Sequence, residues 1–131
     1  MRSAARRRRQ KIKVLIAMFF AVCFGALGDI SLKKGMEVIA DLPDSVDLLH
    51  KMLATITNHY VIGGIVLLAT FLILYLVSLS WEELSYVLPL TAANYVLVTI
   101  LAYFVLGEHV SALRWTGSVL VTLGIALVAR T

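Results

Sequence analysis

The chain has 131 residues, of which 60% are apolar and 15% are charged. An average soluble domain is about 45–50% apolar and about 25% charged, so this composition excludes an ordinary water-soluble domain. It also excludes intrinsic disorder, which requires low hydrophobicity and high net charge, because the net charge is only +4. Cys23 is the single cysteine, so no intrachain disulfide can form.

The chain begins with a basic segment, residues 1–13, which holds seven of the twelve Lys and Arg residues. An apolar segment follows at about 14–34. This order is also typical of a secretory signal peptide, but no Ala-x-Ala cleavage site follows the apolar core. We therefore expect an uncleaved first membrane span behind a basic tail. The tail lacks the aromatic and fold signatures of nucleic-acid binding, so we expect no nucleic-acid partner.

The connection at about 35–58 is the longest loop expected in the chain. Its first half is acidic, and its second half places Leu49, Met52, Leu53 and Ile56 at helical spacing. This spacing predicts either a short amphipathic helix at the membrane interface or a helical extension of the next span. The two interpretations stay open at this point.

Three further apolar segments lie at about 59–80, 84–106 and 113–130. Each is about the length that crosses a bilayer as a helix, and none shows the alternation of a barrel strand. The sequence therefore predicts an all-α integral membrane protein, a bundle of four transmembrane helices. Glycines within the spans are expected to let helices approach closely. These are Gly63, Gly64, Gly117 and Gly124.

The distribution of positive charge predicts the orientation of the bundle. Four spans place both termini on one side of the membrane, where the basic tail and Arg130 contribute eight positive residues. The other side has four, namely Lys33, Lys34, Lys51 and Arg114. Because Lys and Arg in short loops mark the cytoplasmic side, we expect both termini in the cytoplasm.

Asp29 is the most informative single residue of the first span. A carboxylate at membrane depth is costly, and it normally faces a partner or a water-filled cavity. One interpretation is an Asp29–Lys33 ion pair on one helix face near the interface. The other is an intramembrane site for a substrate or a proton.

Polar residues of the third span form a second set of candidates. Ser80 and Glu83 fit a capping box that opens this span, and the Glu82–Glu83 pair also suits an acidic mouth that attracts a cationic head group. Pro89 frees a backbone carbonyl inside the span, and Asn94 requires a polar partner there. Helix packing and the lining of a cavity are the two interpretations.

Nothing in the sequence predicts an enzyme. No metal-ligand spacing, phosphate loop or nucleophile motif occurs. We therefore expect neither a metal nor a cofactor. Gly107 and Glu108 form a tight turn between the last two spans.

Residues 84–128 resemble the C-terminal half of EamA-type proteins of the drug/metabolite transporter superfamily. The first span is also similar to the Gly-polar-x-x-x-Lys helix end of that family, and the four-helix length is similar to that of its small branch. The residues that carry the resemblance are Tyr86 with Pro89, Gly107-Glu108, Gly117, Gly124, Gly28, Asp29 and Lys33.

Two small families of this superfamily compete. Small multidrug resistance proteins carry a membrane-embedded Glu at the position that Gly25 occupies here, and a tryptophan where Pro89 stands, so this chain departs from both features. The small subunits of undecaprenyl-phosphate-aminoarabinose flippases look more similar. The matching residues are Tyr86 with Pro89, Asn94, Glu108-His109-Val110-Ser111 and Trp115.

The resemblance implies a transporter domain at 14–131 in a bacterial inner membrane, a flippase subunit that moves a lipid-linked sugar or polyprenyl-phosphate glycolipid. Four helices do not readily enclose a bulky substrate, so a homo- or heterodimer is expected. The alternatives are a small-solute or cationic-drug exporter and a non-transporting accessory subunit of a glycosyltransferase complex. The implied substrate-binding residues are Asp29, Lys33, Glu82, Glu83, Tyr86, Pro89 and Asn94, with Lys34, Arg8 and Arg9 as contacts for lipid phosphate.

Overall fold

In the computed structural model, residues 3–131 are described, and they form α-helices joined by loops, with no strand among them. Four stretches are long and apolar enough to cross a membrane, one of them built from two consecutive helices. The predicted all-α, four-span architecture is confirmed. The helices are α1 (Ala4–Ala40), α2 (Leu48–Thr57), α3 (His59–Trp81), α4 (Leu84–Leu90), α5 (Ala93–Phe104) and α6 (Ala112–Ala129).

Helix α1 is longer than the membrane is thick. Its 37 residues extend over about 55 Å at 1.5 Å per residue, against about 30 Å of hydrocarbon. The basic residues from Ala4 onward are therefore the first turns of α1, where Ser3 caps the helix by accepting a hydrogen bond from the Arg6 amide. The loop starts at Asp41 instead of the predicted Gly35, since the first strong helix breaker is Pro43, which restricts the residue before it.

The structure decides between the two interpretations of the first loop. Helix α2 is separate from α3, because the Asn58 side chain accepts hydrogen bonds from the amides of Tyr60 (2.9 Å) and Val61 (3.3 Å) and so starts a new helix. None of the α2 residues is buried. Exposed apolar side chains along one short helix are what a helix on a membrane surface requires.

The third span is broken in its middle. Pro89 has no amide hydrogen to donate to the Ser85 carbonyl, and its ring crowds that turn. The helix ends one residue later, and α5 begins at Ala93 after short-range bonds such as the one from the Ala92 amide to the Pro89 carbonyl (3.1 Å). The span therefore changes direction beside Thr91 and Ala92.

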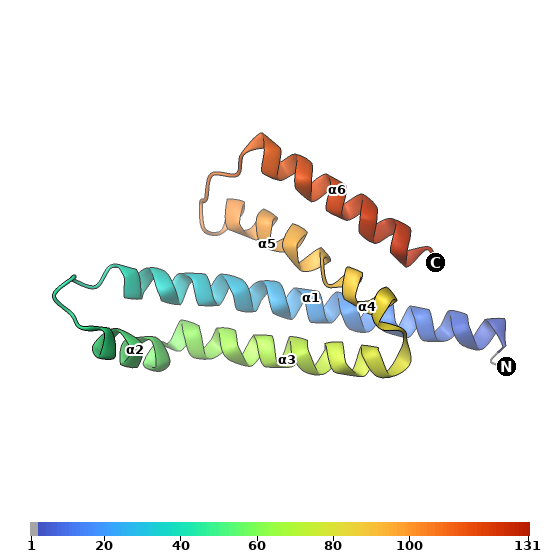
Figure 1. Cartoon of the computed structure of the whole chain (residues 1–131), viewed down its shortest axis with the longest axis horizontal. Coiled ribbons are helices and arrows are strands. Elements are labelled where there is room, and N and C mark those ends of the chain that lie inside the picture. The colour runs from blue at the N-terminus through green and yellow to red at the C-terminus, as the bar shows by residue number, and fades with distance from the viewer. Residues whose placement is uncertain (1–2) are drawn as a thin grey trace.

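Both ends of the described chain lie at the same end of the bundle (Figure 1), as an even number of spans requires. The main buried cluster also lies at this end and joins α1 to α4. Toward the α5–α6 turn, α5 and α6 lean away from α1 and α3 (Figure 1), and Ser118 is the one buried residue of α6. The cluster consists of Val14, Met18, Ala21, Tyr86, Val87 and Leu90.

Helices α1 and α3 approach most closely where two glycines face each other. A Cβ atom on Gly64 would lie 2.9 Å from the Gly28 carbonyl oxygen and 2.8 Å from Leu32 Cγ. The predicted close approach is thus confirmed for Gly64. It is wrong within this chain for Gly63, Gly117 and Gly124, where a Cβ atom would meet nothing within 4 Å.

Neighbouring positions on α3 allow a matched test of this contact. We expect Gly64→Ala to lower the thermal midpoint of the protein in detergent, because the added methyl group pushes backbone against backbone at a cost of about 1–3 kcal/mol. Gly63→Ala makes no such contact and improves helix propensity, so its midpoint should be equal or higher. Equal midpoints for the two variants, measured by circular dichroism, would contradict the packing described here.

Gly107 is the one described residue with a left-handed backbone, at φ +67°. Glycine adopts this conformation without the Cβ penalty, which explains its place in the turn. The following amide, of Glu108, donates to the Ala102 carbonyl at 3.1 Å and closes the turn. This turn lies at the end of the bundle away from the termini (Figure 1).

Candidate functional site

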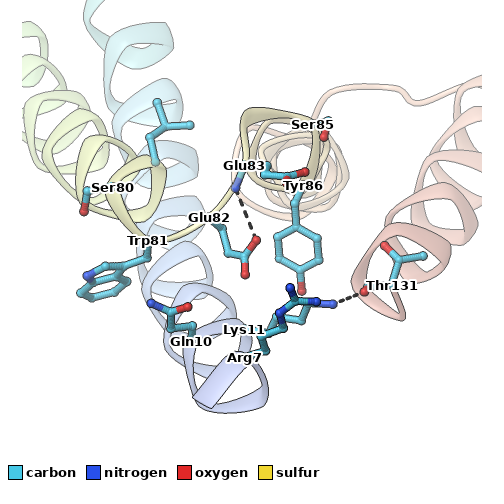
Figure 2. A pocket seen from close by; sticks show the side chains of 11 residues that line it. Arg7, Gln10, Lys11, Ser80, Trp81, Glu82, Glu83, Ser85, Tyr86 and Thr131 are labelled. Carbon is cyan, nitrogen blue, oxygen red and sulfur yellow. Dashed lines mark hydrogen bonds between the residues drawn. The ribbon is translucent and has the colours of Figure 1, made fainter. Parts of the chain in front are cut away.

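A polar pocket of about 540 Å³ opens at the end of the bundle that carries both termini. Its walls come from the first turns of α1, the α3–α4 junction, the start of α4 and Thr131, two residues after α6 (Figure 2). Segments from both halves of the sequence therefore build it. Its size is in the range of small-molecule sites, about 300–1,000 Å³.

The acidic side of the pocket comes from the α3–α4 junction. Glu82 ends α3 and Glu83 precedes α4, both in extended conformation, and both line the pocket. The Glu83 amide donates to Glu82 Oε2 at 3.3 Å. The predicted capping box is wrong, since Ser80 still belongs to α3 and donates its hydroxyl to the Val77 carbonyl (2.6 Å).

The basic side of the pocket comes from α1. Arg7 and Lys11 are one turn apart on the helix and face the acidic junction. The Lys11 ammonium donates to the main-chain oxygen of Thr131 and lies 5.7 Å from the centre of the Tyr86 ring. These two residues were missed as site residues because the whole basic run was interpreted as a topology signal, and Arg9 with Lys13 has the same i, i+4 spacing in the sequence.

Tyr86 forms the floor of the pocket. Its side chain is 6% exposed, and its hydroxyl has no hydrogen-bond partner among the described residues. In Figure 2 this hydroxyl points toward Arg7 and Lys11. A buried hydroxyl without a partner is uncommon in native proteins, and this one has a donor hydrogen and acceptor lone pairs that no described residue uses.

A second polar feature joins α1 to α5. Asn94 Nδ2 donates to Asp29 Oδ2 at 2.8 Å, between residues 65 positions apart. Asp29 forms no ion pair with Lys33, so that interpretation is wrong. The other amide atom, Asn94 Oδ1, is buried without a described partner, and a Cβ atom on Gly25 would lie 3.3 Å from it.

The predicted site residues thus fall into two places instead of one groove. Lys11 and Asp29 are 18 positions apart on one helix, or about 27 Å. Glu82, Glu83 and Tyr86 line the pocket, whereas Asp29 pairs deeper in the bundle with Asn94, which lies midway along the Leu84–Phe104 span.

The remaining predicted residues line neither place. Lys33 and Lys34 lie on α1 beyond Asp29, and Pro89 is half-buried beside the break in the third span. Arg8 and Arg9 are exposed on the first turns of α1, outside the pocket. Their contact with lipid phosphate stays a prediction.

The chain is similar to two curated proteins, each named "Probable 4-amino-4-deoxy-L-arabinose-phosphoundecaprenol flippase subunit ArnE". The one from Pectobacterium atrosepticum is 36% identical over 72 residues, which is 55% of this chain and 64% of that protein. The one from Pseudomonas fluorescens is 26% identical over 116 residues, or 88% of this chain and 96% of that protein. The match to the first relative thus spans just under two thirds of its length. No family model and no solved structure matches the chain.

Proposed function

We propose that this protein is a subunit of a flippase that moves a polyprenyl-phosphate-linked amino sugar across the bacterial inner membrane. The observation that carries the proposal is the mixed charge of the pocket, where Glu82 and Glu83 face Arg7 and Lys11. The substrate in the relatives' name contains an amino group and a phosphate in one head group. Carboxylates complement the amine, and the cations complement the phosphate.

The two polar places suggest how the head group travels. On α1, Arg7, Lys11, Gly25 and Asp29 lie within about 40° of one another around the helix axis, because their spacing follows whole turns. The head group enters at the pocket and passes Asp29 and Asn94 deeper in the bundle, while the lipid chain stays in the bilayer. With both termini in the cytoplasm, as the charge distribution favours, the pocket is the cytoplasmic entrance.

The proposal includes a second subunit. Ser118 is the one buried residue of α6, and most of the other residues of this helix are exposed in the described chain. The relatives are also named as subunits. A homodimer in parallel orientation or a related chain of opposite orientation would cover α6 and complete the path.

The test is a translocation assay in vesicles that contain the protein purified from its native membrane with its bound subunits. A membrane-impermeant, amine-reactive reagent reports how fast the amino-sugar lipid reaches the outer leaflet. We expect translocation of the amino-sugar lipid well above that of protein-free vesicles. The N-acetylated lipid lacks the cation and does not react with this reagent, so its transfer is followed by a radiolabel in the sugar that a membrane-impermeant phosphodiesterase releases from the outer leaflet. This lipid should move more slowly. Glu82→Gln with Glu83→Gln should remove this preference for the free amine.

The control for this assay is the doubly substituted protein itself, which must keep the helical content of the wild type. A translocation rate of the wild-type protein equal to that of protein-free vesicles for both lipids would refute the proposed function. Uptake of a small cation driven by a proton gradient, without lipid movement, would instead favour the drug-exporter alternative.

A further inference from the structure

An apolar groove lies one helical turn deeper in the membrane than the polar pocket. On α1, Leu15 follows Lys11 by one turn, and on α4, Leu90 follows Tyr86 by one turn. Ile125 of α6 closes the groove from the third side. The pocket and the groove are thus consecutive stretches of one seam between α1, α4 and α6.

The size of the groove limits what it can hold. Its volume is about 160 Å³, and an apolar cavity of about 150 Å³ accommodates a molecule as large as benzene. That corresponds to about six carbon atoms, or one isoprene unit. Phe19, on the rim of the groove, is 66% exposed, so the groove is open toward the lipid.

We propose that this groove binds the isoprene unit next to the phosphate of the lipid whose head group occupies the polar pocket. This inference rests on the proposed function. A phosphate held by Arg7 and Lys11 leaves its chain at the mouth of the groove, and the chain must continue toward the hydrocarbon side. The seam offers apolar walls in that direction, made by Leu15, Met18, Leu90 and Ala93.

The groove is surrounded by lipid and not by water, and this determines how it contributes to binding. A lipid chain is already in an apolar environment in the bilayer, so entering the groove brings no hydrophobic gain and depends on packing contacts alone. Each atom pair contributes about 0.1–0.2 kcal/mol. The groove therefore positions the phosphate and selects the first chain segment, while the charged pocket supplies most of the binding.

Two adjacent phenylalanines on α1 allow a matched test in the full-length protein. Phe19 lines the groove, whereas Phe20 lies outside it at the same depth and is 52% exposed. Each is replaced in turn by p-benzoylphenylalanine, a photo-crosslinker, in nanodiscs that contain undecaprenyl phosphate and phospholipid. We expect the ratio of polyprenyl to phospholipid adducts at position 19 to exceed that at position 20 about fivefold or more.

The possible outcomes distinguish specific binding in the groove from non-specific contact with lipid. They also test the groove independently of the proposed transport. Equal ratios at the two positions would overturn the site. Equal enrichment at position 19 of phosphatidic acid, whose phosphate is attached to a diacylglycerol and not to a polyprenyl chain, would also overturn it. Enrichment at position 19 in a protein that fails the translocation assay would overturn transport and leave the chain site standing. Translocation without enrichment would overturn the chain site alone.

A second variant tests the same groove by filling it. Ala93→Trp occupies the space between α1 and α5, and Ala126→Trp places the same ring on an exposed position of α6. We expect Ala93→Trp to weaken retention of undecaprenyl phosphate in native mass spectrometry about fivefold, at unchanged helical content, and Ala126→Trp to leave it unchanged. Equal retention by the two folded variants would overturn the site.

Discussion

Replacing Arg7 and Lys11 together by glutamine is expected to slow translocation of the amino-sugar lipid at least about tenfold. Both cations face the pocket, and each charge-assisted hydrogen bond to a phosphate contributes about 1.5–3 kcal/mol. Removal of both leaves the phosphate without its partners at the entrance. The rate of amine labelling in vesicles measures this effect.

The same helix provides a control for charge. Arg6 and Lys13 are exposed and lie outside the pocket, so Arg6→Gln with Lys13→Gln removes the same two charges from the same segment. This control tests whether the basic run acts only through membrane orientation or anionic lipid. Equal losses in the two double variants would refute a specific role of the pocket cations.

Replacing Asp29 by leucine is expected to abolish translocation and also to destabilise the bundle by about 1–3 kcal/mol, since the half-buried Asn94 amide loses its acceptor. Asp29→Asn keeps an oxygen acceptor and should retain most of the stability. The thermal midpoint and the vesicle assay, measured on the same preparations, record the two effects separately.

The double variant Asp29→Leu with Asn94→Leu separates a binding site from a structural pair. Replacing both partners by apolar groups removes the unsatisfied amide, so stability should recover relative to the single variant. If the carboxylate receives the head group, translocation stays lost in this stable protein. Full translocation by the double variant would show that the pair serves packing alone.

The candidate site was predictable in part, and the reason differs from residue to residue. Asp29 and Asn94 stand out in the sequence because polar groups are costly at membrane depth. Their hydrogen bond to each other was not predictable, because it joins α1 to α5 across 65 positions. Arg7 and Lys11 were hidden among neighbouring cations, and only the direction in which each faces from α1 distinguishes them.

The sequence by itself determined the fold class and the number of spans. Hydrocarbon contains no partner for an exposed backbone amide, so any apolar segment of this length must be helical. The excess of arginine and lysine near the start likewise predicted an orientation without any knowledge of packing.

Only the tertiary structure decided which residues meet. It placed the α3–α4 junction against the first turns of α1, and thereby put Glu82 opposite Arg7 and Lys11. It also broke the third span after Pro89 and set Gly64 against Gly28. Such contacts depend on the packing of surfaces between helices, and in lipid this packing is a matter of close fit and hydrogen bonds that hydrophobicity along the chain does not record.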